Sequence, residues 1–171
     1  MSISEELMTR NTLFAAQRFS PGLRMMPALR TIVIGCVDPR VDPELLLGAQ
    51  VGEVAVIRNV GGRVTPGVLD ELAMLRSVTQ AAGGDLGAGW EVIVLQHTDC
   101  GITRLAGDDA TLAGFLGVRT DEVGTKSVGD PRAAVAHDVG ILDGETRLGA
   151  GLRVSGMVYD VTTGLVDAVR P

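Results

Sequence analysis

The chain has 171 residues, which is enough for one ordinary domain to bury an apolar core without disulfides. Hydrophobic residues make up 46% of it but aromatic residues only 3%, so the core must consist mainly of aliphatic side chains. The formal net charge is -6 and no basic run interrupts the chain, which argues against a nucleic-acid partner.

The apolar stretches are strand-sized and fall well short of the roughly 20 residues that span a bilayer. The chain does not open with a charged segment followed by an apolar one, so no secretory signal is evident. We therefore expect a cytoplasmic protein with no membrane partner. In a reducing compartment its two cysteines, Cys36 and Cys100, are expected to be metal ligands or inert buried thiols rather than a disulfide.

Hydrophobic spacing and turn residues predict the secondary structure in chain order. An amphipathic helix is expected over residues 2–19, with Ser2 or Ser4 as its N-cap, and Ser20-Pro21-Gly22 ends it. Short β-branched runs predict buried strands over residues 31–36, 53–58, 91–96 and 152–159, followed by a short last strand after Thr162-Thr163-Gly164. Helices are predicted over residues 66–82 and from Asp130-Pro131 to about Leu142, whereas residues 117–129 have no clear period and are expected to be loop.

Strands that are apolar on both faces and alternate with helices indicate a parallel sheet covered on both sides. The predicted fold class is α/β, with a mostly parallel sheet of about four strands plus a short edge strand, flanked by helices. No repeat or linker divides the chain, so residues 1–171 are expected to form a single domain.

Three side chains with metal-binding chemistry fall at the carboxyl ends of predicted strands. Cys36 ends the first strand, His97 follows the third, and Cys100 lies three positions further on. Ligands bind at this edge of open α/β sheets, so the three side chains can converge. Two thiolates and an imidazole favour Zn²⁺, and three protein ligands leave a fourth position for water. Inert buried thiols and a chance His-x-x-Cys spacing are the alternative interpretation.

Asp38 and Arg40 follow Cys36 at alternate positions and therefore leave the strand on the same side. A carboxylate and a guanidinium so placed can pair and orient a metal site, although a surface ion pair explains them too. Residues 58–62, Arg-Asn-Val-Gly-Gly, end the second strand with a glycine pair that permits close backbone approach, or makes a simple turn.

Four separated motifs together resemble those of the β-class carbonic anhydrases, in particular the compact microbial members. They are Cys36-Val-Asp-Pro-Arg40, Ile57-Arg-Asn-Val-Gly-Gly62, the helix opened by Gly67-Val-Leu, and His97-Thr-Asp-Cys-Gly101. The resemblance is strongest over residues 31–105 and continues more weakly to residues 158–165. Each motif alone is weak, but their order, spacing and strand-end positions together are specific.

The resemblance implies that Cys36, His97 and Cys100 bind zinc and that Asp38 and Arg40 form the catalytic dyad. Zinc lowers the pKa of its bound water from 15.7 towards roughly 7, and the resulting hydroxide attacks CO2 to give bicarbonate. In the family's closed form the aspartate, here Asp38, takes the fourth zinc position.

The resemblance also suggests a substrate pocket and a partner. The pocket would involve Ala55, Val60, Gly61 and Gly101, and Gly101 would permit close backbone approach beside the metal. Plant-type members have a glutamine and a phenylalanine where this chain has Pro27 and Ala55, so those pocket contacts are missing. Family members form homodimers or larger oligomers in which the opening helix packs on the partner, although the apolar stripe of residues 7–19 also fits packing within the chain.

Other functions have to be weighed against this one. A zinc-stabilised structural module is one alternative, although such sites usually have four protein ligands and the only further Cys or His is His137. His137 is expected to be an exposed helical histidine rather than a proton shuttle, whereas Asp38 could still complete a closed structural site. Hydrolysis of CS2 or another CO2-like molecule is a second. Deaminase chemistry is excluded because it requires glutamate two positions after the histidine, where this chain has Asp99.

Overall fold

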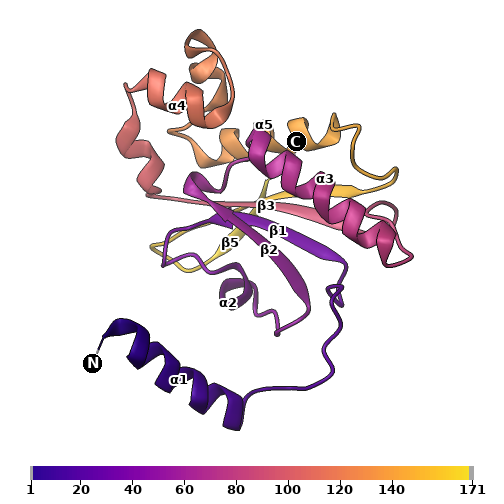
Figure 1. The fold of residues 1–171 in the computed structure, drawn as a ribbon. Coiled ribbons are helices and arrows are strands. Elements are labelled where there is room, and N and C mark those ends of the chain that lie inside the picture. The colour runs from indigo at the N-terminus through magenta and orange to yellow at the C-terminus, as the bar shows by residue number, and fades with distance from the viewer. Residues whose placement is uncertain (1, 170–171) are drawn as a thin grey trace.

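A computed structural model describes residues 2–169 and places five strands in one sheet (Figure 1). The strand order is β2-β1-β3-β4-β5, in which the first four strands are parallel and β5 runs antiparallel to β4. This confirms the predicted fold class. The strands are β1 (Thr31–Cys36), β2 (Val54–Asn59), β3 (Glu91–His97), β4 (Arg153–Tyr159) and β5 (Val166–Val169).

The predicted helices are present, and the chain also contains shorter ones that the sequence pattern did not reveal. None of the helices in residues 2–169 has the length and apolar character needed to cross a bilayer. The α-helices are α1 (Ile3–Gln17), α2 (Pro43–Leu47), α3 (Pro66–Ala81), α4 (Asp109–Leu116) and α5 (Pro131–Asp143). The 3-10 helices are η1 (Val60–Gly62), η2 (Gly101–Leu105) and η3 (Thr120–Lys126).

The prediction of a loop over residues 117–129 was wrong in its middle, where η3 lies. Its turns have 3-10 hydrogen bonding, which repeats every three residues and leaves no α-helical period in the sequence. Glu122 supports the start of η3 by accepting from the backbone N–H of Arg119 at 3.0 Å. The signal for this segment was therefore local capping rather than periodicity.

Helices α3 and α5 cover one face of the sheet, and α2 lies on the opposite face (Figure 1). The main core forms where alternate residues of the strands meet Val68 and Leu72 of α3 and Val135 and Val139 of α5. Strand β1 has only its first residue partly exposed, which fits a central parallel strand. The sheet is thereby a rigid platform that fixes where each strand ends.

Helix α1 stands away from the sheet and is joined to it by residues 18–30 (Figure 1). Ser2 is its N-cap, and Ser2 and Glu5 form a reciprocal capping box. No residue of α1 is buried by the rest of residues 2–169, and Leu7 and Leu13 are both more than half exposed. Packing of the opening helix within its own chain is therefore not observed.

A candidate metal centre at the strand ends

Cys36, His97 and Cys100 converge on one point at the carboxyl edge of the sheet. Cys36 is the last residue of β1 and His97 the last of β3, and these two strands are parallel neighbours. The three potential ligand atoms all lie within 4.8 Å of one another, and all three residues are buried. The two sulfur atoms are 3.7 Å apart. The three residues form a cluster that could bind a metal ion.

The His97 ring is oriented with one nitrogen free to bind a metal. Its Nδ1 lies 2.9 Å from the carbonyl oxygen of Thr98, so Nδ1 carries the proton and donates it. Nε2 is buried and has no hydrogen-bond partner among the described residues. A buried, unpaired imidazole nitrogen is costly unless a ligand satisfies it. This atom is direct evidence that the cluster fits a metal.

The Cys36 sulfur is prepared to carry negative charge. Backbone N–H groups of Gly61 and Asp38 point to it at 3.3 and 3.4 Å. The pKa of Cys36 is lowered by the hydrogen bond from Cys100, by His97 and by these two amides, which together outweigh burial. The pKa of Cys100 is raised because its proton is held by Cys36 and because it is buried. These contacts favour the thiolate at Cys36, and binding of a cation favours loss of the thiol protons.

Apolar side chains of α4 and η3 enclose the two cysteines. Cys36 and Cys100 belong to a second hydrophobic cluster with Ile102, Leu112, Ala113, Leu116 and Val123. This cover lowers the local dielectric and strengthens the interaction of the thiolates with a cation. The two unpredicted helical segments thus form the cover of the candidate site.

His137 is not a further ligand, because its Nε2 pairs with Lys126 Nζ at 2.9 Å. It is partly buried on α5, so the expectation of an exposed helical histidine was wrong. The chain has only two histidines and two cysteines, and no third member of either type remains to complete a four-ligand structural site. The cluster therefore leaves a coordination position open.

Asp38 and Arg40 form an ion pair beside the cluster. Arg40 Nη2 and Nε donate to the two Asp38 carboxylate oxygens at 2.7 and 3.0 Å, and the Arg40 backbone N–H adds a bond of 2.9 Å. These hydrogen bonds lower the pKa of Asp38 to about 2. One Asp38 oxygen lies 4.0 Å from His97 Nε2. An ionised carboxylate therefore faces the free nitrogen of the cluster.

Sequence analysis did not anticipate that Asp99 also binds Arg40. Arg40 Nη1 donates to an Asp99 carboxylate oxygen at 3.0 Å, and Nη2 donates to the Asp99 carbonyl at 3.0 Å. Asp99 has a left-handed backbone (φ 51), which a non-glycine residue adopts only rarely. Its place inside the His-x-x-Cys loop was the available signal.

Arg58 was also missed as a site residue and was assigned only to a strand end. Its guanidinium donates to the carbonyl oxygens of Cys36, Asp38 and Val41 at 2.8, 2.9 and 3.0 Å. Three bonds from one planar group fix the loop that carries Asp38 and Arg40. Arg58 is therefore a structural clamp behind the ion pair.

The close backbone approach that the glycine pair permits occurs at Gly62, against the ends of neighbouring strands. A Cβ on Gly62 would lie 3.0 Å from both the Cys36 nitrogen and the Leu95 carbonyl oxygen, and its φ is +60. A Cβ on Gly101 would meet no atom of the described residues within 4 Å. Gly101 therefore has open space beside it among the described residues, and its close approach to a metal stays a prediction.

The residues expected to line a substrate pocket are not all together. Gly61 contacts the Cys36 sulfur and Val60 precedes it with 46% of its surface exposed. Ala55 pairs with Ile32, four positions before Cys36, and so lies about 13 Å away along the strands. It lines a cavity with Met26 and Pro27 at the other end of the sheet. Within this chain Ala55 cannot contact a ligand at the cluster.

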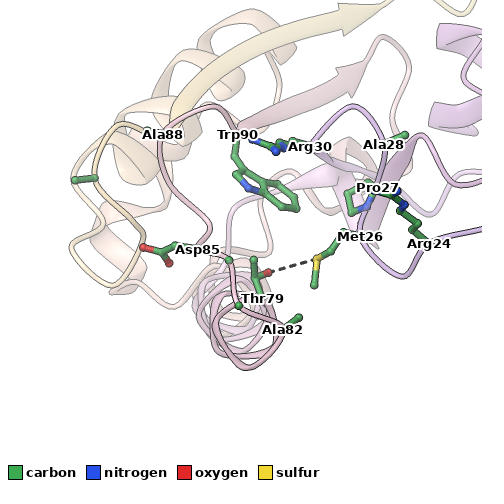
Figure 2. Close-up of a pocket in the computed structure, with 13 residues that line it drawn as sticks. Arg24, Met26, Pro27, Ala28, Arg30, Thr79, Ala82, Asp85, Ala88 and Trp90 are labelled. Carbon is green, nitrogen blue, oxygen red and sulfur yellow. Dashed lines mark hydrogen bonds between the residues drawn. The ribbon is translucent and has the colours of Figure 1, made fainter.

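A larger cavity of about 670 Å³ also lies at that opposite edge, where β1 and β3 begin. Figure 2 shows Trp90 and Arg30 on one side of it and Thr79 and Met26 on another. None of the residues lining it is a cysteine or a histidine. Among residues 2–169, the group of three close potential metal ligands is the one at the carboxyl edge of the sheet.

Together these features define a class of protein, namely an α/β domain with a buried Cys-His-Cys metal-binding cluster at parallel strand ends. The family model of carbonic anhydrase matches residues 31–126, which is more than half of the chain. The chain belongs to the carbonic anhydrase family, and its relatives place it in the β class.

Three comparisons show how near these relatives are. Beta-carbonic anhydrase 1 of Mycobacterium tuberculosis is 29% identical over 100% of both chains. The crystal structure of carbonic anhydrase from Streptococcus mutans has a TM-score of 0.76 at 28% identity and covers 99% of both chains. A carbon disulfide hydrolase from Saccharolobus solfataricus is 36% identical over 55% of this chain and 43% of its own length.

Proposed function

We propose that this protein catalyses the reversible hydration of CO2 to bicarbonate and a proton, with zinc held by Cys36, His97 and Cys100. The observation that carries the proposal is the buried, unpaired Nε2 of His97, which faces two thiols and the Asp38 carboxylate. Two sulfur ligands and one imidazole suit zinc better than a harder cation. When bound, zinc supplies a nucleophile from water at neutral pH.

Asp38 is proposed to orient the proton-bearing nucleophile by accepting a hydrogen bond from it. Its lowered pKa, about 2, keeps the carboxylate ionised and able to accept throughout the neutral range. Arg40 holds Asp38 in that position through two side-chain bonds. Release of Asp38 from Arg40 would allow the same carboxylate to become a fourth metal ligand and close the site.

CO2 is proposed to approach the cluster from the side of Val60 and Gly61. The Gly61 amide already contacts the Cys36 sulfur, so a substrate beside this turn lies next to the metal position. Val60 offers an apolar surface to a molecule that has no net dipole. Gly101, which follows Cys100 directly, is proposed as the opposite wall.

The partner is proposed to be a second copy of this chain, with α1 packed on it. The support is that α1 leaves Ile3, Leu7, Met8 and Leu13 more than half exposed. A helix that buries none of its apolar residues in its own chain gains stability only against another surface.

Hydrolysis of CS2 is the alternative reaction, and the archaeal carbon disulfide hydrolase is the relative that favours it. A zinc-stabilised module without turnover is the alternative of another class. The ion pair of Asp38 with Arg40 argues against it, because Arg40 occupies the carboxylate that a four-ligand structural site would need as its fourth ligand.

Two matched histidine variants test the proposal. Zinc content is measured by mass spectrometry, CO2 hydration by stopped flow, and CS2 hydrolysis by sulfide release. We expect one zinc per chain and CO2 hydration in the natural protein and in His137→Gln, and loss of both in His97→Gln. Stoichiometric zinc without hydration at alkaline pH would contradict the carbonic anhydrase assignment, and sulfide release under the same conditions would establish the alternative reaction.

A further inference from the structure

Arg63 is a charged side chain almost completely removed from solvent. It follows η1, and its side chain and that of Asp138 on α5 are each only 1% exposed. Arg63 Nε and Nη2 donate to the two Asp138 oxygens at 2.8 and 3.0 Å. Asp138 also accepts from the Val64 backbone N–H at 3.0 Å and from Gln96 Nε2 at 3.2 Å. The carboxylate is fully satisfied.

The guanidinium is not satisfied. An arginine has five N–H donors, and Nε and Nη2 account for three of them through Asp138 and the Lys126 carbonyl at 2.8 Å. Nη1 is buried and has no hydrogen-bond partner among residues 2–169. Buried donors on a charged group are strongly unfavourable unless something accepts from them. The protein therefore retains two N–H groups for an acceptor that its own described residues do not supply.

Arg63 lines a cavity of about 40 Å³ that is large enough for such an acceptor. One water molecule needs roughly 10–15 Å³ of this kind of space, so a small ion also fits. The walls include Gln96, Ile102, Val128 and Asp99, together with two of the three potential metal ligands, His97 and Cys100, but neither Cys36 nor Asp38. The cavity thus lies beside the metal cluster, on the side of His97 and Cys100, and does not include Cys36 or the Asp38 carboxylate.

The charges around this cavity favour an anion over a neutral molecule. Arg63 and Lys126 are cationic, and the Asp138 carboxylate is paired with Arg63. Asp99 also lines the cavity, but its carboxylate is paired with Arg40 and Arg104. His137 adds no charge, because its Nε2 accepts from Lys126 Nζ and the imidazole is then neutral. The group carries one net positive charge in an environment of low dielectric, where a counter-ion is attracted strongly.

We propose that this cavity is a binding site for a small monovalent inorganic anion, of halide size, which accepts hydrogen bonds from Arg63 Nη1. The anion neutralises the Arg63, Lys126 and Asp138 group and links the end of η3 to α5 and the sheet. His97 and Cys100 border the cavity, but the donor proposed to hold the anion is Arg63 Nη1, so the site does not depend on the reaction proposed for the metal cluster.

Bromide locates the site directly. Crystals of the zinc-loaded protein are grown in bromide, and anomalous scattering is recorded at the bromine edge. We expect a bromide peak within hydrogen-bond distance of Arg63 Nη1, separate from any peak at the metal. Bromide peaks elsewhere with only water at Nη1 would overturn the proposal.

A stability titration tests whether the anion binds at moderate concentration. Melting temperature is measured against bromide at constant ionic strength, with gluconate as the balancing anion because it is too large for the cavity. We expect a rise that saturates, as for any ligand of the native state. The rise should disappear in the double variant Arg63→Met/Asp138→Leu, which removes the buried pair together.

A cavity variant covers the case in which the double variant does not fold. Val128→Leu keeps Arg63 and Asp138 and narrows the cavity. It should raise the bromide concentration that gives half of the rise in melting temperature at least tenfold. A halide effect that persists unchanged in this variant, with no bromide peak at Nη1, would show that the anion acts elsewhere. Activity is not used as a readout, because anions can also reach a metal.

Discussion

Arg40 donates to Asp99 as well as to Asp38, so one guanidinium connects the loop after β1 to the loop after β3. The Asp99 contacts, at 3.0 Å to a carboxylate oxygen and 3.0 Å to the carbonyl, leave Arg40 bonded even if Asp38 moves. Asp99 also lies 3.5 Å from Arg104. The ion pair beside the cluster is therefore part of a network of four charged residues.

Asp99→Asn should lower kcat/KM modestly, while Asp38→Asn should lower it severely. Asparagine keeps a carbonyl acceptor and tolerates the left-handed backbone, and Asp99 is more than half exposed, so its pairing is worth up to about 1 kcal/mol, or about fivefold. Loss of the Asp38 carboxylate should cost about 100-fold or more. Stopped-flow CO2 hydration with zinc content as the control measures both. Equal losses in the two variants would contradict this division of roles.

Gly62→Ala should destabilise the protein much more than Gly101→Ala. A methyl group on Gly62 meets backbone atoms at 3.0 Å in a left-handed conformation, whereas one on Gly101 meets nothing within 4 Å of the described residues. We expect a loss of about 2 kcal/mol or more for Gly62→Ala and less than about 0.5 kcal/mol for Gly101→Ala. Urea unfolding of the two zinc-loaded variants measures the difference, and similar midpoints would show that the strand ends relax freely.

The convergence of the potential metal ligands could be predicted from the sequence because strand ends can be recognised in a linear pattern. Short β-branched runs marked where β1 and β3 stop, and parallel neighbours bring Cys36 and His97 to one edge. Close backbone approach was expected at the glycine pair that ends with Gly62, but the atoms that crowd it belong to Cys36 and Leu95, far along the chain, so no local pattern names them. Arg63 and Asp138 are 75 positions apart, so no local pattern indicates that they pair.

Acidification should destabilise the protein partly through His137. Burial lowers the pKa of His137 from 6.5, Lys126 and Arg63 add to that effect, and only Asp138 opposes it. The unfolded chain therefore binds this proton more readily than the native one. The contribution of neutral His137 to the free energy of unfolding is fully present above about pH 6.5, and it is lost as the pH drops below that value.

His137→Gln isolates this contribution. The free energy of unfolding is measured in urea between pH 7.5 and pH 5, at fixed ionic strength. The free energy of unfolding should fall less on acidification in His137→Gln than in the natural protein. In the natural protein, the His137 ring signal in NMR should titrate below pH 6.5. Parallel pH curves for the two proteins would show that the native and unfolded pKa values are equal.

Metal removal should uncover the two thiols and loosen the strand ends. Treatment with a chelator should leave a protein in which both cysteines react with a thiol reagent, while the zinc-loaded protein should show neither reacting. The melting temperature should fall on removal and recover when zinc is restored. If both thiols react at the same rate before and after chelation, they do not hold the metal.

Helix α1 should control the size of the assembly. Leu7 and Leu13 are 53% and 56% exposed, so a charge at each costs little within one chain. Against a partner surface, however, Leu7→Asp/Leu13→Asp would bury two unpaired carboxylates, which is enough to separate copies that associate through α1. Light scattering after gel filtration should therefore show an oligomer for the natural protein and a monomer for this variant. Glu6→Gln on the same helix is the control, and it should keep the natural mass. An unchanged mass in the double variant would mean that copies associate through another face, and a natural protein that is already monomeric would remove the role proposed for α1.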